Sequence, residues 1–155
     1  MSLLSPGTRV HLVGIGGSGL SAIARVLHGW GYNVSGSDRE TTPLTRALAA
    51  EGITVWHGHE ASHLGNATLV VVSSAVPDDN PEVVAARQRG LPVLKREQFL
   101  GELTATKEII AVAGTHGKTT TTAMLAWILD QAGLDPTFVV GGELQNLGTN
   151  AQAGN

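Results

Sequence analysis

The stretch Gly14-Ile15-Gly16-Gly17-Ser18-Gly19 follows a β-branched, apolar run at residues 8–13 and opens a segment, 18–30, with apolar residues at helical spacing. Between a strand and a helix, a G-x-G-x-x-G pattern is typical of nucleotide-binding turns. Its glycines permit the tight turn, the approach of a diphosphate to the backbone, and close packing of helix on strand. Asp38 stands where an acidic residue would meet a ribose. Alone, the pattern favours a dinucleotide such as NAD, and a glycine-rich packing turn is the alternative.

The next part of the chain repeats this alternation of strand and helix. The expected strands are residues 33–37, 53–56, 68–73 and 92–94, and the expected helices are residues 42–51, 80–89 and 97–103. Leu69-Val70-Val71-Val72 is continuously apolar, as in a parallel strand that is buried on both faces. Asn80-Pro81 is typical of the first residues of a helix. The alternation predicts an α/β fold with a Rossmann-like, doubly wound parallel sheet that binds ligands at the carboxyl ends of its strands.

A second glycine-rich stretch is Ala113-Gly114-Thr115-His116-Gly117-Lys118-Thr119-Thr120. It follows an apolar run at 109–113, which we expect to be a strand, and opens an expected helix at 119–132. A helix N-terminus offers unpaired N–H groups to phosphate, and glycines let the backbone come close. Lys118 adds a positive charge, and Thr119 adds a hydroxyl that can ligate Mg²⁺. The stretch therefore predicts a phosphate loop for ATP and Mg²⁺, with a structural turn carrying a surface lysine as the alternative.

The predicted domain boundary lies near residue 106. Residues 1–106 would form the Rossmann-like domain, and residues 107–155 would begin a P-loop ATPase domain. After the phosphate loop we expect one helix, a short strand at 137–140 and a polar, glycine-rich tail at 145–155 without a closing element. That is too little for a whole mononucleotide-binding domain, so we expect a truncated chain. Apolar residues at helical spacing in the last helix are expected to pack in a core: Met124, Leu125, Ile128 and Leu129.

Composition and charge exclude several classes of protein. Of the 155 residues, 42% are hydrophobic and 15% are charged, as in ordinary globular proteins. The net charge of −3 gives no electrostatic reason to expect a nucleic-acid partner. The chain has no cysteine, which excludes disulfides and thiolate metal sites. No apolar run approaches the roughly 20 residues of a membrane helix, and the N-terminus lacks signal-peptide features. We therefore expect a cytoplasmic protein without membrane insertion.

In their order and spacing, these motifs resemble the Mur ligases of peptidoglycan synthesis. The stretches that carry the resemblance, within residues 9–151, are 14–19, Gly36-Ser37-Asp38, Ser73-Ser74-Ala75, Asn80-Pro81-Glu82, 114–121 and Gly148-Thr149-Asn150. The resemblance implies a three-domain enzyme: a Rossmann-like domain for a UDP-sugar, a central ATPase domain and a C-terminal domain for an amino acid. Within the family, the motifs are most similar to the member that adds L-alanine to UDP-N-acetylmuramate.

The resemblance also implies the reaction and the site residues. ATP would phosphorylate the muramoyl carboxylate, and the amine of L-alanine would displace phosphate from the acyl phosphate to form an amide. Lys118 and Thr119 would be catalytic, with Thr119 on Mg²⁺, because the developing charge must be neutralised. ATP would be held by Gly114, Thr115, His116, Gly117, Lys118, Thr119 and Thr120. The UDP diphosphate would be held by Gly16, Gly17, Ser18, Gly19, Ser73 and Ser74, with Asp38 and His59 near the uridine.

Other functions stay open at this point. The family member that recycles murein tripeptide has a similar phosphate loop. An NAD-dependent dehydrogenase would use the first glycine turn and have no need of Lys118, whereas a non-catalytic nucleotide-binding module would bind without turnover. His57, His59 and His63 could together hold a metal. The alternatives are a solvated strand end or, for His59, contact with uracil. The sequence does not indicate an oligomeric state.

Overall fold

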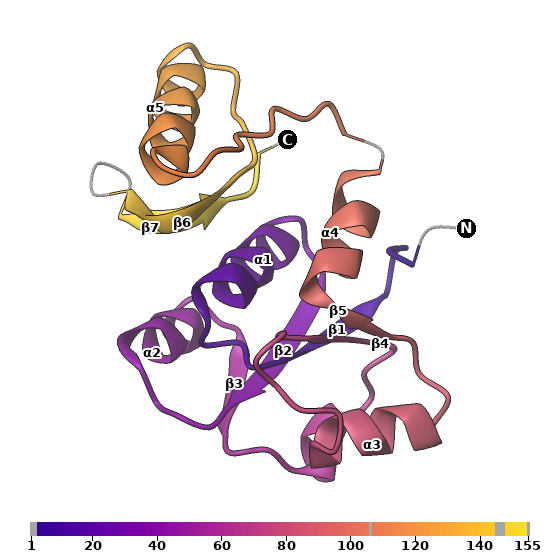
Figure 1. Ribbon diagram of the computed structural model, residues 1–155. Coiled ribbons are helices and arrows are strands. Elements are labelled where there is room, and N and C mark those ends of the chain that lie inside the picture. Colours follow the sequence, from indigo (N-terminus) through magenta and orange to yellow (C-terminus); the bar gives the residue numbers. More distant parts are fainter. Residues whose placement is uncertain (1–2, 106, 145–147, 155) are drawn as a thin grey trace.

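The computed structural model describes residues 3–105, 107–144 and 148–154. Its larger part is a five-stranded, all-parallel sheet with strand order β3-β2-β1-β4-β5, covered by helices on both faces (Figure 1). The predicted doubly wound α/β sheet is confirmed. The elements are β1 (Arg9–Val13), α1 (Ser18–Gly29), β2 (Asn33–Asp38), α2 (Pro43–Ala50), β3 (Thr54–His57), the 3₁₀-helix η1 (Ala61–Leu64), β4 (Leu69–Val72), α3 (Pro81–Gln88), β5 (Val93–Lys95), α4 (Arg96–Thr104), α5 (Lys118–Gln131), β6 (Phe138–Leu144) and β7 (Thr149–Gln152).

Strand β1 lies at the centre of the sheet, between β2 and β4. The chain runs outward from β1 to β3 and then returns to form β4 on the other side of β1. In open α/β sheets, ligands bind beyond the carboxyl ends of the strands, where the strand order reverses in this way. Gly14, which follows β1, and Ser73, which follows β4, therefore flank the expected binding crevice.

Helices α1, α2 and α4 cover one face of the sheet, and α3 with η1 covers the other (Figure 1). Strand β4 contributes to both cores: Leu69 and Val71 pack on the first face, and Val70 and Val72 pack on the second. The uninterrupted apolar run of this strand follows from its burial on both faces, as predicted.

Two helices begin at residues that cap them. The hydroxyl of Thr42 accepts a hydrogen bond from the Thr45 backbone N–H at 3.2 Å at the start of α2. The buried side chain of Asn80 accepts one from the Glu82 N–H at 2.9 Å at the start of α3. Such bonds satisfy N–H groups that have no partner within the helix. The predicted helix start at Asn80-Pro81 is confirmed.

The turn after β1 crosses directly over β2. Ile15 is fully buried, and a Cβ built on Gly36 would lie 2.7 Å from its Cδ1 atom and 2.6 Å from the Leu12 carbonyl oxygen. Position 36 therefore accepts only a residue without a side chain. The Gly14 and Ile15 N–H groups donate to the Ser37 carbonyl at 2.8 and 3.1 Å. The geometry of the glycine turn thus depends on a glycine in the neighbouring strand.

A buried polar cluster joins α3 to the sheet. Its centre is Glu82, which has no exposed surface. One carboxylate oxygen, Oε2, accepts hydrogen bonds from the Ser37 hydroxyl at 2.5 Å and from His11 Nε2 at 3.2 Å. The other, Oε1, accepts from His63 Nδ1 at 2.9 Å and from the Glu60 backbone N–H at 3.2 Å. A carboxylate offers about four lone-pair sites, so the four donors saturate it.

The last two strands, β6 and β7, form an antiparallel pair that packs against α1 (Figure 1). Ala151 contacts Ala22 and Val26, and the Trp30 indole N–H donates to the Gly154 carbonyl at 3.1 Å. The prediction of a tail without a closing element is therefore wrong for residues 149–152. Residues 145–147 and 155 of that tail lie outside the described residues. Contacts with a helix far away in the sequence stabilise this pair, and local patterning does not reveal them.

The segment at 109–113 contains no strand, so the prediction of one there is wrong. Ile109 and Ile110 are 56% and 67% exposed. A strand needs a neighbour for its backbone hydrogen bonds, and within the described residues no strand pairs with this segment. The boundary near residue 106 stays a prediction, because that residue is not described. Among the described segments, no helix has the length and apolar character needed to cross a lipid bilayer.

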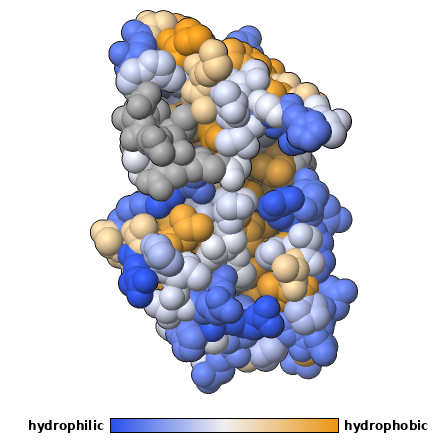
Figure 2. Space-filling view, turned by 60° about the vertical axis from the view of Figure 1, so that its left-hand side comes forward, coloured by the Kyte–Doolittle hydropathy of each residue, from blue (hydrophilic) through white to orange (hydrophobic). Residues whose placement is uncertain are grey.

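Helix α5 presents part of its apolar surface to solvent. Ala126 packs against Phe138 and Val140, but Met124 and Ile128 are 59% and 57% exposed. The expectation of a core stripe at these two positions is therefore wrong for the described residues. Figure 2 shows hydrophobic, orange surface in the upper part of the molecule, where α5 lies.

We predict that Gly36→Ala lowers the free energy of unfolding by about 1–3 kcal/mol, because the new methyl group would overlap Leu12 and Ile15. Urea denaturation followed by circular dichroism measures the change. Gly101→Ala is the matched control: a Cβ at position 101, in α4, meets no atom within 4 Å. It should leave stability unchanged or raise it by up to about 1 kcal/mol. Equal effects of the two substitutions would contradict the proposed packing.

We predict an acid-sensitive contribution from Glu82. Burial alone raises the pKa of its carboxyl, but hydrogen bonds from His11, Ser37 and Glu60 and the charge of His11 lower it from 4.5 to about 2. A lowered folded-state pKa stabilises the fold above pH 4.5, and this stability is lost as the pH falls towards 2. Relative to Glu82→Gln, the natural chain should lose on the order of 3 kcal/mol across this window. Denaturant titrations at each pH measure it, and parallel pH profiles would refute it.

Candidate functional site

The glycine turn lies beside the residue that follows β4. Gly14 has φ +85°, and a Cβ there would lie 2.9 Å from Ser73 Cβ. The structure thus brings the 14–19 turn and Ser73 together. The Ser73 hydroxyl accepts a hydrogen bond from the Ala75 N–H at 3.3 Å, and Ser74 is exposed. This edge of the sheet therefore carries a glycine turn with two adjacent serines.

Asp38 shapes the glycine turn directly. Its Oδ2 atom accepts a hydrogen bond from the Gly16 N–H at 2.8 Å, and its Oδ1 atom accepts one from the Glu40 N–H at 3.1 Å. The Gly17 N–H donates to the Gly14 carbonyl at 3.2 Å. In this conformation the Gly16 and Gly17 amides are thus engaged within the chain. The next N–H groups, in the first turn of α1, are the ones that helix geometry leaves for an anion.

Arg96, the first residue of α4, lies against Gly19 in the glycine turn. A Cβ at Gly19 would lie 2.6 Å from Arg96 Nη1. The Nη2 group donates to Glu97 at 2.9 Å, whereas the buried Nε has no hydrogen-bond partner among the described residues. A guanidinium beside a helix N-terminus adds to the positive potential that favours an anion. Sequence reasoning missed Arg96, because no local motif links it to the distant glycine turn.

His59 lies in the loop after β3, at the edge of the buried cluster. Its Nδ1 atom is 2.9 Å from the Ser37 hydroxyl and 3.7 Å from Glu82 Oε2. Its side chain is 11% exposed, so part of the ring reaches the surface. Ser37 also accepts the N–H groups of the glycine turn through its carbonyl. His59 and the turn are therefore held by the same residue of β2.

The three histidines near the end of β3 bind different partners and do not converge on one point. His57 ends the strand, and its Nδ1 atom is 3.4 Å from the Thr41 hydroxyl. His63 donates to Glu82 and stacks on Trp56, with ring centroids 5.1 Å apart. Within residues 3–105, 107–144 and 148–154, no group of three potential ligands is arranged to hold a metal ion.

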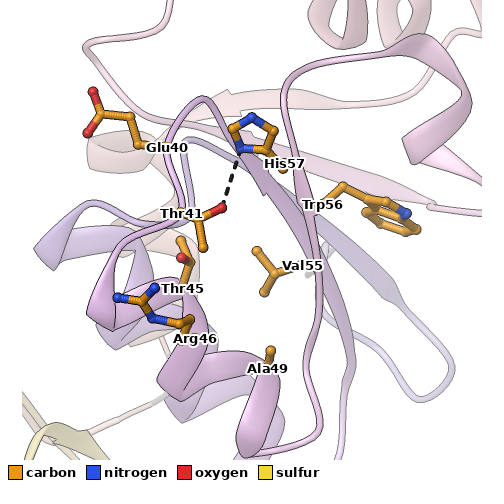
Figure 3. Close-up of a pocket in the computed structure, with 8 residues that line it drawn as sticks. All are labelled: Glu40, Thr41, Thr45, Arg46, Ala49, Val55, Trp56 and His57. Carbon is orange, nitrogen blue, oxygen red and sulfur yellow. Dashed lines mark hydrogen bonds between the residues drawn. The ribbon is translucent and has the colours of Figure 1, made fainter.

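A shallow pocket of about 130 Å³ lies between α2 and β3, beyond the end of β2 (Figure 3). Thr41 and His57 form one side of it, joined by their hydrogen bond, and Val55 and Ala49 line its inner part. Ligand pockets usually measure roughly 300–1,000 Å³, so this one can enclose only part of a nucleotide-sized molecule.

The predicted phosphate loop is an exposed turn at the N-terminus of α5. Gly114 and Gly117 have φ values of +154° and +80°, which favour glycine, and Gly117 precedes the first residue of the helix. The Lys118 ammonium donates to the Gly114 carbonyl at 2.5 Å, across the turn. The hydroxyl of Thr119 would lie 3.4 Å from a Cβ on Gly141. Thr115 and His116 are exposed in the same turn, and Thr120 is exposed in the first turn of α5.

Strand β7 contacts the start of α1. The buried Asn150 donates through Nδ2 to the Ser18 carbonyl at 3.2 Å and to the Ser21 hydroxyl at 3.3 Å. Its Oδ1 atom accepts a hydrogen bond from Arg25, which also forms an ion pair with Glu51 at 2.8 Å. The Gly148-Thr149-Asn150 motif therefore ties the hairpin to the helix that opens at the first glycine turn.

Comparison with known proteins agrees with the resemblance to the Mur ligases that the sequence motifs show. Residues 9–108 match the model of the "Mur ligase family, catalytic domain", which ends before the phosphate loop. The UDP-N-acetylmuramate–L-alanine ligases of Methylobacillus flagellatus and Chromobacterium violaceum are 57% and 56% identical over 145 residues. These alignments cover 94% of this chain but only 30% and 31% of the relatives. The chain thus spans about a third of their length.

Two solved structures extend the comparison. The UDP-N-acetylmuramate-alanine ligase of Thermotoga maritima has a TM-score of 0.89 at 39% identity, over 95% of this chain and 35% of that one. A murein peptide ligase of Psychrobacter arcticus has a TM-score of 0.86 at 35% identity, over 96% of this chain and 34% of that one. The match to the family model covers most of the chain, and these similarities extend it past the phosphate loop. The chain belongs to the Mur ligase family.

Proposed function

We propose that this chain is the UDP-sugar-binding part, with the beginning of the ATP-binding part, of a ligase that joins L-alanine to UDP-N-acetylmuramate. The observation that carries the proposal is the presence of two glycine turns at helix N-termini, at the starts of α1 and α5. Two such turns suit an enzyme that holds two phosphorylated molecules. Both curated relatives named above are L-alanine ligases, at higher identity than the murein peptide ligase.

In this proposal the first turn binds the diphosphate of the UDP-sugar. The free N–H groups of α1 would donate to its oxygens, and Arg96 would add a positive charge beside Gly19. Ser73 and Ser74 would bind from the end of β4. Asp38 would act mainly by holding the Gly16 amide, which keeps the turn in shape. His59 would contact the uridine from the adjacent loop.

The second turn would bind ATP and Mg²⁺. Positive φ at Gly114 and Gly117 and an exposed helix N-terminus fit a phosphate group. When bound, ATP would supply the phosphoryl group that activates the muramoyl carboxylate, and Mg²⁺ would neutralise its charge. Lys118 would leave the Gly114 carbonyl to hold a phosphate oxygen, and Thr119 would ligate the metal. Thr115, His116 and Thr120 would complete the loop.

The rest of the ATPase domain is proposed to follow residue 155, with the domain beginning near residue 107. The exposed apolar face of α5, including Met124 and Ile128, supports this, because apolar surface of this kind is normally covered. The relatives are about three times as long, so this chain alone is not expected to turn over. A reaction that consumes ATP and a nucleotide-sugar is expected in the cytoplasm.

We predict that the chain binds UDP-N-acetylmuramate saturably in calorimetric titration, whereas NAD shows no binding. Arg96→Gln should weaken the UDP-sugar about tenfold or more, because a hydrogen bond to a charged group is lost. Arg87→Gln, with the same loss of charge on α3, is the control and should bind normally. Binding of NAD in place of the UDP-sugar would favour a dehydrogenase and contradict the proposal.

We predict that Lys118→Ala abolishes measurable binding of an ATP analogue with Mg²⁺ and leaves UDP-N-acetylmuramate binding unchanged. The reason is that the two phosphate groups would use separate turns. Lys107→Ala, which removes a lysine outside the loop, is the control for both titrations. Equal weakening of both ligands by Lys118→Ala would show that the turns do not act separately.

A further inference from the structure

The positions of the protons in the buried cluster can be inferred from the hydrogen bonds of Ser37. Its hydroxyl has a single proton, which it donates to Glu82 Oε2 at 2.5 Å. The Nδ1 atom of His59 lies 2.9 Å from the same hydroxyl oxygen. That oxygen can only accept from the ring, so Nδ1 of His59 carries a proton. In the neutral imidazole, Nε2 is then a bare acceptor.

We infer that Glu82 is a positioning residue that acts through Ser37 to hold His59 with a protonated Nδ1 and a bare Nε2, so that His59 accepts a hydrogen bond from the ligand. The ligand group that faces Nε2 would be an N–H or O–H donor, such as the imide of a uracil or a hydroxyl of a ribose. The ligand part of this inference rests on the proposed function, whereas the proton arrangement does not.

The other donors leave Glu82 no freedom to change this arrangement. The Glu60 backbone N–H and His63 Nδ1 fill Oε1, and His11 Nε2 shares Oε2 with Ser37. The other ring nitrogen of His11, Nδ1, lies 2.9 Å from the Ser35 hydroxyl. Every hydrogen bond to Glu82 is therefore donated to the carboxylate, the one buried anion of this cluster.

The hydrogen bonds from His59 to Ser37 and from Ser37 to Glu82 form a relay. An amide in place of the Glu82 carboxylate would reverse the direction of both hydrogen bonds. The Glu60 N–H can only donate, so the amide oxygen of Glu82→Gln must take the place of Oε1. The amide nitrogen then stands at Oε2, where it donates one proton to Ser37 and one to His11 Nε2, which must give up its own proton. The proton of Ser37 then turns toward His59 Nδ1. His59 would become protonated at Nε2 and would present a donor to the ligand. Glutamine has nearly the same shape as glutamate, so Glu82→Gln keeps the packing of the side chain while it reverses the hydrogen bonds to Ser37 and His59. The substitution therefore distinguishes a positioning role of Glu82 from a packing role.

The first measurement is long-range ¹H–¹⁵N nuclear magnetic resonance of the imidazole rings, with His59 assigned by the loss of its signals in His59→Asn. We expect a protonated Nδ1 in the natural chain and a protonated Nε2 in Glu82→Gln. Ser35→Ala is the matched control, since Ser35 lies on the same strand and contacts His11 but not His59. It should leave the His59 signals unchanged.

The second measurement is calorimetric titration of the same chains with UDP-N-acetylmuramate. Glu82→Gln should bind about two- to tenfold more weakly, which is the effect of one misdirected hydrogen bond. Ser35→Ala should bind as the natural chain does. Circular dichroism and thermal unfolding of each variant separate loss of the ligand contact from loss of the fold.

The proton arrangement at His59 and the role of Glu82 in ligand binding are tested separately. A protonated Nε2 on His59 in the natural chain overturns the relay, even if Glu82→Gln does not fold. An unchanged His59 in folded Glu82→Gln overturns it as well. A reversed ring with unchanged affinity overturns the role of Glu82 in ligand binding. If the natural chain does not bind the UDP-sugar, the proposed function fails, and the resonance spectra alone decide the relay.

Discussion

The carboxylate of Glu82 joins segments that are far apart in the chain. It holds His11 on β1, Ser37 on β2 and His63 in the segment after β3, and it belongs to α3 itself. A buried ion is costly unless hydrogen bonds replace its hydration, and here four donors do so. Through the carbonyl of Ser37 the same cluster supports the N–H groups of the first glycine turn. The geometry of the candidate site thus depends on one buried anion.

The hairpin of β6 and β7 is linked to the five-stranded sheet domain by contacts with α1. Asn150 binds the Ser18 carbonyl, Ala151 packs on Ala22, and Trp30 binds the Gly154 carbonyl. Helix α5, with the phosphate loop at its start, packs against β6 of the same hairpin. The helix that begins at the first turn therefore also supports the hairpin on which the second turn rests. In the proposed ligase, this arrangement would connect the UDP-sugar site to the ATP site.

Part of the candidate site is visible in the sequence, because short motifs mark it. The two glycine turns need particular residues at fixed spacing, and Asp38 follows from its place at the end of a strand. Arg96 and the proton arrangement at His59 are not visible, since they depend on contacts between distant segments. Glu82 stands in a motif that carries the family resemblance, but its burial against the sheet gives no local signal. Its role appears only when α3 packs on β1 and β2.

Local patterning by itself determined the α/β alternation, the helix start at Asn80 and the double burial of β4, because propensities and caps act over a few residues. Only the tertiary structure decided that residues 109–113 form no strand, since a strand exists only with a partner. It likewise decided that residues 149–152 pair with β6 on the surface of α1. The direction of each hydrogen bond around Glu82 was also decided at that level, because donors from separate segments must share two oxygens.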